Sequence, residues 1–269
     1  MPISSLPSTL APETPLRAAR ILAERRLAGQ AGPPLPAELR PHTIEQALAI
    51  QRAVSPLMGD TIGGWKCGTP GPDKLVVSPI YASTIHRVGH GHRPCMAWAH
   101  DGQVRIEPEL AFVLGHDLPP RDQPYTPAEV DAAISHTHLA LELIDSRYED
   151  GSELSFADKL ADGLVNQGLF IGPEVDAAAA QQTHAMRIGI SIEGESDTER
   201  AGQHPDPLPR LPLYWLANHL RDQGPGLRAG QVVITGSYAG TFGVPVERDV
   251  SLRFGELGVL SVRLTARDA

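Results

Sequence analysis

The chain has 269 residues, of which 41% are hydrophobic and 20% are charged, so it carries enough apolar material for a folded core. Its formal net charge of -9 argues against binding to nucleic acid or to an anionic membrane surface, because both partners need basic patches. Two cysteines are too few for a disulfide framework. Neither a signal-peptide pattern nor a run of about 20 apolar residues is evident, so we expect a cytoplasmic protein.

The first 60 residues predict two helices. In "TPLRAARILAERRLAG", Thr14 is a candidate N-cap, Pro15 takes the first helical position and Gly29 ends the helix. In "TIEQALAIQRAVSPLMG", apolar side chains recur at three- and four-residue spacing, at Ala47, Ile50, Val54 and Leu57. We therefore expect residues 1–60 to form an N-terminal helical cap and residues 61–269 to form a β-rich catalytic domain.

Beyond residue 60, short strand-like runs are divided by glycine and proline: "TIGGWKCG", "KLVVSPIY" and "QVRIEPELAFVLG". A helix follows in "YTPAEVDAAISH", where Thr126 and Glu129 have capping-box spacing and Pro127 lies in the first turn. "THLALELIDSRY" alternates like a strand, and "LPLYWLANHLRDQG" predicts a helix ending at Gly224. Three more strand-like runs close the chain: "QVVITGSYAG", "GVPVERDVSLRFG" and "GVLSVRLTA". The pattern indicates an α+β protein with an antiparallel or mixed sheet.

The stretch "RIEPELAFVLG" places two glutamates in a strand that continues with the apolar residues typical of a buried core. Strand alternation places Glu107 and Glu109 on one face, which turns apolar at Ala111 and Val113. One interpretation is an exposed strand end, with Pro108 marking a sheet edge and both carboxylates in water. The other is a divalent-metal site, because alternate strand residues aim two oxygen ligands at one point.

Glu142 is the candidate for a third ligand. It lies in the apolar strand pattern "LALELIDSRY", where an unpaired buried charge is costly. An ion pair with Arg147 is the alternative, and Asp145 reads as structural support. Lys66, in "GGWKCG", is the fourth candidate: desolvation or a nearby charge would move its pKa, although a solvated edge lysine fits the same pattern.

The histidines suggest a different metal, zinc, but the sequence has none of the residue spacings that are typical of zinc ligands. "HRVGHGH" groups His86, His90 and His92 in a loop that we interpret as a surface feature, and "SHTHL" places His136 and His138 at strand spacing. His138 could reach a site near the third glutamate, but the pattern does not assign it there. The chain shows no nucleophile elbow, no phosphate-binding loop and no dinucleotide-binding glycine fingerprint.

Six segments in the same order resemble one family: "GGWKCG", "RIEPELAFVLGHDL", "LALELIDSRYE", "LADGLVNQGLFIG", "WLANHL" and "AGQVVITGSYAG". The chain is similar, from about residue 15 to its end, to the 2-keto-4-pentenoate hydratase and 4-oxalocrotonate decarboxylase family within the fumarylacetoacetate hydrolase superfamily. The resemblance implies a mixed β-roll or sandwich body with a helical N-terminal part, assembled as homo-oligomers.

The resemblance also implies a set of functional residues. Glu107, Glu109 and Glu142 fall on the positions that hold Mg²⁺ or Mn²⁺ in the family. Lys66 falls on the position of the family's lysine, which is implied to act as an acid–base or charge-stabilising group. Lys66, Ser237 and Asp162 are also expected to bind substrate. Ser237 lies on the T-G-S turn, and Asp162 lies in "ADGLVN".

The sequence departs from the family pattern at two places. Where many members read "ADNAS", Gly163 and Val165 stand in this chain, so a polar pocket wall is missing or is supplied by Asn166. The family turn "P-x-[FY]-G" reads "PIYA" here, from Pro79 to Ala82. These departures affect the expected substrate more than the expected metal.

The leading hypothesis is a metal-dependent lyase that hydrates acids of the 2-hydroxypenta-2,4-dienoate type to 4-hydroxy-2-oxo acids in aromatic-compound degradation. The alternatives are a decarboxylase of 4-oxalocrotonate (2-oxo-3-hexenedioate) and a non-catalytic metal-binding partner of a related hydratase or decarboxylase. Loss of Lys66 or of a glutamate would signal that partner role, and all four residues are present. A structural β-protein with solvated carboxylates is the remaining possibility. Hydrolysis of carbon–carbon bonds is the least expected, because "GTPGPDKLVVSP" lacks a matching histidine–glutamate pair.

Overall fold

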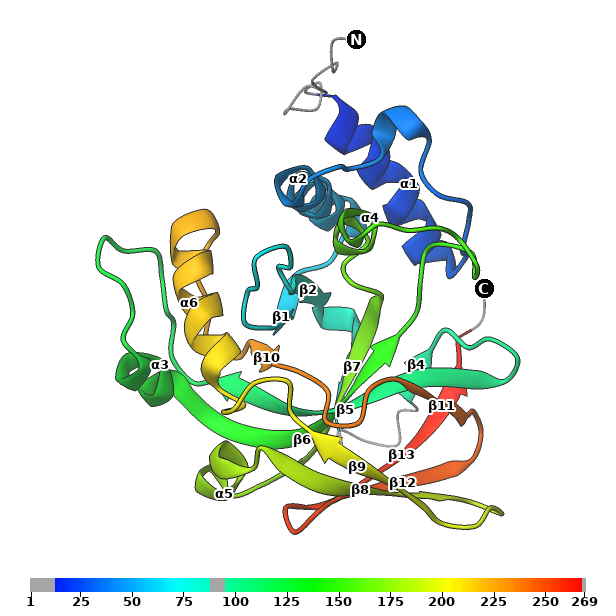
Figure 1. Ribbon diagram of the computed structural model, residues 1–269, viewed down its shortest axis with the longest axis vertical. Coiled ribbons are helices and arrows are strands. Elements are labelled where there is room, and N and C mark those ends of the chain that lie inside the picture. The colour runs from blue at the N-terminus through cyan, green and yellow to red at the C-terminus, as the bar shows by residue number, and fades with distance from the viewer. Residues whose placement is uncertain (1–12, 88–94, 268–269) are drawn as a thin grey trace. The chain divides into compact units, whose positions relative to one another are not determined.

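The computed structural model describes residues 13–87 and 95–267 (Figure 1). His90 and His92 of the predicted histidine cluster lie outside these residues. The chain divides into two compact units: the first comprises Met1–Asp60 with Ser146–Val165, and the second comprises Thr61–Asp145 with Asn166–Ala269. The segment 146–165 therefore packs with the N-terminal helices, although the sequence pattern placed it in the β-rich part.

The first unit is helical. Its elements are α1 (Thr14–Ala28), α2 (Ile44–Val54), α4 (Phe156–Ala161) and two short 3₁₀ turns, η1 (Ala37–Leu39) and η2 (Ser55–Met58). Helix α1 begins one residue earlier than expected, because Glu13 and not Thr14 takes the capping position, and it ends at the left-handed Gly29 (φ 63°). Thr43 caps α2 by accepting a hydrogen bond from the Gln46 amide.

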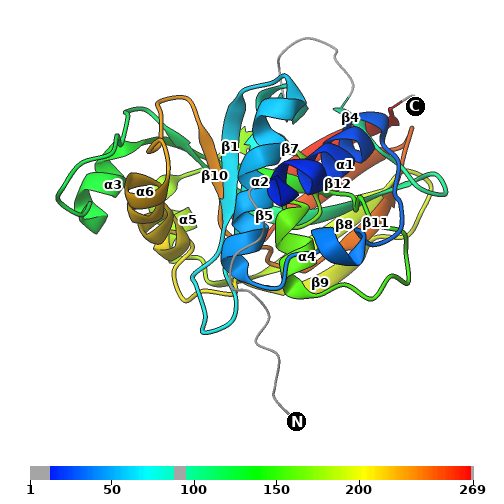
Figure 2. The same cartoon turned by 90° about the horizontal axis from the view of Figure 1, so that it is seen from above.

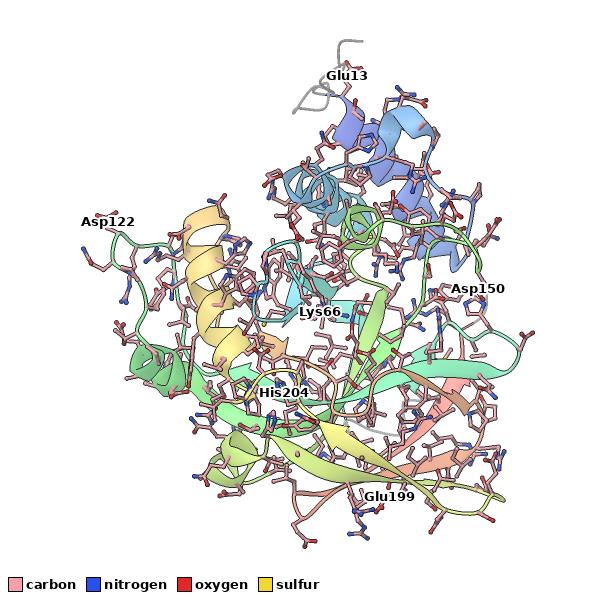
Figure 3. All side chains as sticks on the ribbon, viewed as in Figure 1. Glu13, Lys66, Asp122, Asp150, Glu199 and His204 are labelled. Atoms are coloured by element: carbon pink, nitrogen blue, oxygen red, sulfur yellow. The ribbon has the colours of Figure 1, made fainter. Side chains whose placement is uncertain are left out.

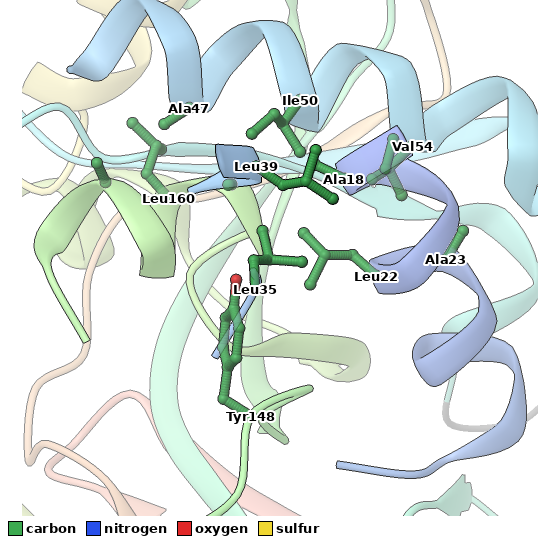
Figure 4. Packing of buried hydrophobic residues seen from close by; sticks show 13 residues of the cluster. Ala18, Leu22, Ala23, Leu35, Leu39, Ala47, Ile50, Val54, Tyr148 and Leu160 are labelled. Carbon is green, nitrogen blue, oxygen red and sulfur yellow. The ribbon is translucent and has the colours of Figure 1, made fainter. Parts of the chain in front are cut away.

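Three helices of this unit bury one apolar cluster. Figure 4 shows Leu22 of α1, Ile50 of α2 and Leu160 of α4 meeting around it. Each of these side chains is at most 2% exposed. The three-to-four-residue spacing that predicted α2 thus corresponds to its buried face, and the partner from α4 arrives from more than 100 residues later in the chain.

The second unit contains two mixed or antiparallel sheets. The larger, eight-stranded sheet has the order β2-β1-β10-β5-β6-β7-β3, with β11 also paired to β5. Its strands are β1 (Ile62–Cys67), β2 (Val77–Tyr81), β3 (Ile85–Arg87), β5 (Gln103–Leu114), β6 (Ile134–Ile144), β7 (Asn166–Glu174), β10 (Val232–Ile234) and β11 (Phe242–Pro245). The pairs β1–β10 and β3–β7 are parallel and the other pairs are antiparallel.

The smaller, five-stranded sheet has the order β4-β13-β12-β8-β9. Its strands are β4 (Cys95–Ala97), β8 (Ala185–Ile192), β9 (Thr198–Gln203), β12 (Asp249–Phe254) and β13 (Gly258–Ala266). The remaining elements of the second unit are η3 (Ala82–Thr84), α3 (Pro127–Ala133), α5 (Ala177–Gln182) and α6 (Leu211–Gln223). This arrangement confirms the predicted α+β class with a mixed β-roll body.

Helices α3 and α6 lie side by side in both views of the second unit (Figures 1 and 2). Arg210 at the start of α6 pairs with Asp131 of α3, and the Tyr214 hydroxyl donates to the same carboxylate at 2.9 Å. The predicted capping box of Thr126 and Glu129 is present. The helix is shorter than "YTPAEVDAAISH" suggested, because β6 already begins at Ile134 and pairs with β5.

No helix among the described residues is long and apolar enough to cross a membrane. The two cysteines, Cys67 and Cys95, are both buried and unlinked.

A buried ion pair in the first unit makes its stability depend on pH. Asp158 is fully buried, holds the Ser155 amide in the cap of α4, and accepts from Arg40 through both carboxylate oxygens. Burial raises the pKa of Asp158, but the hydrogen bonds from Arg40 and Ser155 outweigh burial, so the pKa lies below its usual 3.8. The ionised form therefore stabilises the fold above about pH 4, and this contribution disappears as the pH falls through the lowered pKa.

We expect Asp158→Asn to lower the free energy of unfolding by about 1–3 kcal/mol at pH 7, the range for a hydrogen-bonded charge. The difference from the wild type should shrink at pH 3, because the unfolded chain, with its usual aspartate pKa of 3.8, already takes up the proton there. Urea unfolding at both pH values measures this, with the exposed Asp197→Asn as the matched control. An undiminished difference at pH 3 would contradict the assignment.

Candidate metal and substrate site

The three predicted glutamates come together because of the register between β5 and β6. Glu107 lies directly opposite Glu142, and Glu109 lies opposite the small Ala140. One carboxylate oxygen from each glutamate lies within 4.8 Å of the other two. Glu109 is 2% exposed, which rules out an exposed strand end as its environment, and Glu107 is half-buried. Glu142 is fully buried.

Four groups of the second unit compensate these charges. Glu142 Oε1 lies 2.6 Å from Lys66 Nζ and accepts a hydrogen bond from Asn166 Nδ2 at 2.8 Å. The Gly236 amide donates to Glu109 Oε2 at 2.7 Å. The remaining contact joins the Thr241 hydroxyl to Glu107 Oε1.

The compensation is incomplete at one atom. Glu142 Oε2 is buried and has no hydrogen-bond partner among the residues that the structure describes. A buried acceptor without a partner costs free energy, and a carboxylate oxygen is the ligand that a hard divalent cation prefers. Two ligands on opposite sides of such a cation lie about 4 to 5 Å apart. The three oxygens lie within 4.8 Å of one another, which does not exceed this separation, so the three carboxylates fit a divalent cation.

Burial and mutual repulsion oppose ionisation of the cluster. Burial, followed by the charges of Glu142 and Glu107, raises the pKa of Glu109 well above its usual value. Burial also raises the pKa of Glu142, against the lowering effect of Lys66. A positive charge placed between the carboxylates would reverse this balance.

Lys66 is mostly buried, so it is not a solvated edge lysine, and both burial and a nearby charge act on its pKa. Burial alone lowers the pKa of the ammonium group, but the charges of Glu142 and Glu107 and the contact with Glu142 together outweigh burial, so the pKa is raised. The side chain therefore carries its proton at neutral pH. Figure 3 marks its position on β1.

The three glutamates border a pocket of about 280 Å³. Its lining includes Lys66 and the three glutamates, together with three further segments: the hairpin after β1, residues 205–206, and the end of β10 with its turn. The volume is at the small end of the range for ligand pockets, about 300–1,000 Å³, which suits a small organic acid.

Ser237 lines this pocket, as the T-G-S assignment requires. Among the described residues its hydroxyl makes only a long 3.4 Å contact, to the Gly240 carbonyl, so it retains capacity to bind a ligand. The preceding Gly236 has φ 144°, and a Cβ there would lie 2.6 Å from Pro205 Cγ. Only glycine therefore fits where the amide must reach Glu109.

Asp162 has a different environment. It belongs to the first unit, where its carboxylate lies 2.5 Å from Arg147 Nε and also accepts from the Arg147 amide. Arg147 therefore pairs with Asp162 and not with Glu142, which corrects the alternative reading of the third glutamate. A substrate-binding role for Asp162 stays a prediction.

The structure also shows the contacts of Asp145 and His138. Asp145 pairs with His100 at 2.7 Å, in the supporting role expected of it. His138 Nδ1 contacts the Gly172 carbonyl at 3.0 Å and does not line the pocket. Sequence reasoning missed Thr241 and the Gly236 amide, because neither has a recognisable pattern apart from the turn that contains them.

Comparison with known proteins identifies relatives across the second unit and beyond. Residues 66–266 match the family model described as "Fumarylacetoacetate (FAA) hydrolase C-terminal". The chain is 28% identical over 226 residues to a 2-keto-4-pentenoate hydratase of Burkholderia vietnamiensis, covering 81% of this chain and 84% of the relative. It is 30% identical over 171 residues to a 4-oxalocrotonate decarboxylase of a Pseudomonas species, covering 62% and 63%.

Among solved structures, the fold is similar to a 4-oxalocrotonate decarboxylase from Pseudomonas putida G7, complexed with magnesium and adipate. The TM-score is 0.76 at 19% sequence identity, over 96% of this chain and 99% of that chain. The likeness extends over both units and confirms the fold. With the family model matched over residues 66–266, the chain belongs to the fumarylacetoacetate hydrolase family.

Proposed function

We propose that this chain is a divalent-metal-dependent lyase, using Mg²⁺ or Mn²⁺, that hydrates acids of the 2-hydroxypenta-2,4-dienoate type to 4-hydroxy-2-oxo acids. The observation that carries the proposal is the meeting of Glu107, Glu109 and Glu142 with Lys66 around one small pocket. Such a site suits small anionic substrates whose reaction develops further negative charge.

The three glutamates would hold the cation. When bound, a divalent cation supplies Lewis-acid stabilisation of negative charge on the 2-oxygen of the substrate. Magnesium in the solved decarboxylase structure, named in its description with adipate, supports a divalent cation and a small carboxylic acid here. The orphaned Glu142 Oε2 supports the same assignment independently.

The chain's own residues supply orientation and a proton. Lys66 Nζ is protonated and lies at the pocket wall, where it can stabilise an anionic substrate or deliver its proton when the 2-hydroxydienoate ketonises. Ser237, which lines the pocket, would donate a hydrogen bond from its hydroxyl to a substrate carboxylate or oxo oxygen. Glu142 and Asn166 hold one another in position behind the cation site.

Decarboxylation of 4-oxalocrotonate is the second candidate, because a relative of that name is 30% identical over 171 residues. The same stabilisation of charge on the 2-oxygen would take up the electron pair that CO₂ leaves behind. A non-catalytic metal-binding partner is disfavoured, since the four residues that such a partner would be expected to lose are present and assembled. Assembly as homo-oligomers, or with a related enzyme, stays a prediction.

The deciding experiment is an absorbance assay on 2-hydroxypenta-2,4-dienoate and on 2-oxo-3-hexenedioate, with Mg²⁺ and then with a chelator. Chelator-sensitive loss of the dienoate, with a 4-hydroxy-2-oxo product, supports the hydratase. Release of CO₂ from the dicarboxylate supports the decarboxylase instead. Inactivity on both acids with Mg²⁺ bound would contradict both reactions.

Glu142→Gln tests the cation site without depending on turnover. We expect Mg²⁺ to raise the melting temperature of the wild type, because a ligand that binds only the folded state stabilises it. The variant should lose this rise and bind Mg²⁺ more weakly by at least the roughly 10–100-fold typical of losing even an outer-shell group. Glu256→Gln, at an exposed turn, is the matched control. Equal Mg²⁺ affinity in wild type and Glu142→Gln, measured by calorimetry, would refute the site.

Lys66→Met separates the proton-carrying role from metal binding. We expect kcat to fall by about 10²- to 10⁴-fold, as for a lost general acid or base. Mg²⁺ affinity should be retained or increased, because the substitution removes a positive charge next to Glu142. Calorimetry for the metal and steady-state kinetics for turnover provide the two readouts. A loss of Mg²⁺ affinity matching the loss of kcat would show that Lys66 acts only by maintaining the site.

A further inference from the structure

A second lysine lines the pocket. The sequence contains twenty arginines but only three lysines: Lys66, Lys74 and Lys159. Two of the three, Lys66 and Lys74, line the pocket that holds the glutamates. Lys66 is already engaged with Glu142, so the pocket holds one cationic side chain more than the carboxylate cluster uses.

Lys74 is held at the pocket by its backbone. It lies in the hairpin that joins β1 to β2, the cyan strands of Figure 1. The Gly71 amide donates to the Lys74 carbonyl at 2.8 Å, and the Gly68 amide donates to the Val76 carbonyl at 3.0 Å. The main chain at Lys74 is thereby fixed, while its exposed side chain remains able to follow a ligand.

No carboxylate of the described chain forms an ion pair with Lys74 within 4.0 Å. Asp206 is the one further acidic residue in the pocket lining, and it is not paired with this lysine. The charge of Asp206 instead adds to burial and to Glu109 in raising the pKa of the Cys67 thiol. Its backbone amide is tied to His204 Nδ1 at 3.0 Å, on the segment marked in Figure 3.

These observations define a pocket whose lining carries charges of both signs. Its carboxylates fit a cation, which would take the carboxylate and 2-oxo oxygens of a 2-oxo acid. Lys74, which lines the same pocket, has an ammonium group with no ion-pair partner among the described residues. A monocarboxylic acid leaves that ammonium unused, whereas a dicarboxylic acid supplies a second anionic group for it.

We propose that Lys74 binds the distal carboxylate of a 2-oxo dicarboxylic acid and makes the site selective for diacids over monoacids of the same length. The inference rests on the proposed function, because it assumes that the 2-oxo end binds at the glutamates. It favours a dicarboxylate as the physiological substrate, whether the reaction is hydration or decarboxylation.

The test uses two unreactive six-carbon ligands that differ only in the distal group, 2-oxohexanedioate and 2-oxohexanoate. Calorimetric titration of the full chain in Mg²⁺ should show the diacid binding at least about tenfold more tightly, the lower end for a charge-assisted hydrogen bond. Lys74→Met should reduce the diacid affinity to that of the monoacid, and Lys74→Arg should keep a preference for the diacid. Lys159→Met, an exposed lysine of α4, controls for loss of charge.

The outcomes separate this inference from the proposed function. Equal binding of the two acids by the wild type, or a diacid preference that survives in Lys74→Met, would overturn the role of Lys74 while leaving the 2-oxo acid site intact. Failure of both acids to bind in Mg²⁺ would instead overturn the proposed function. Thermal unfolding of each variant verifies that a lost preference does not reflect a lost fold.

Discussion

The pairing of Glu107 with Glu142 across β5 and β6 is the constraint on which the site depends. Like charges directly opposite one another destabilise a sheet, and burial of Glu142 adds a desolvation cost. Glu109, two residues farther along the same face of β5, adds a third negative charge and so increases the repulsion. The surrounding elements of the second unit therefore have to supply positive charge and hydrogen-bond donors, and they do so from β1, β7 and the turn between β10 and β11.

Each of these elements brings a different kind of group. β1 contributes a charged ammonium, β7 an amide side chain, and the turn a backbone N–H that only a glycine can place there. Lysine rather than arginine suits the position next to Glu142, because its compact ammonium contacts one carboxylate oxygen as a point charge. Elsewhere the chain uses the planar fork of arginine, as where Arg147 holds Asp162.

Sequence patterns predicted the structure well where a feature depends on residues that are close together in the chain. Caps depend on residues three or four positions apart, so Glu129 could be paired with Thr126, and Gly224 could be recognised as a helix end. Strand alternation needs only a period of two, so Glu107 and Glu109 could be placed on one face. The prediction was less successful for β8 and β9, which were not identified: β9 is almost entirely exposed and so carries no hydrophobic alternation.

Partners distant in sequence could not be assigned in this way. Arg147 lies closer in sequence to Glu142 than Lys66 does, yet Lys66 is the residue that reaches it, although β10 and β5 lie between β1 and β6 in the strand order. The segment 146–165 read as part of the β-rich domain, but Leu160 packs with the N-terminal helices. Contacts of this kind depend on register and strand order, which residue spacing does not encode.

The sequence by itself determined the class of the protein, the shared face of Glu107 and Glu109, and, through six ordered segments, the family. These follow from short-range periodicity and from residue identity. Only the tertiary structure decided that Glu142 stands opposite Glu107, that its second oxygen has no hydrogen-bond partner in the part of the chain that the structure describes, and that Lys74 lines the same pocket as Lys66. The physical reason is that burial and electrostatic compensation are properties of the assembled sheet, to which segments more than 100 residues apart contribute.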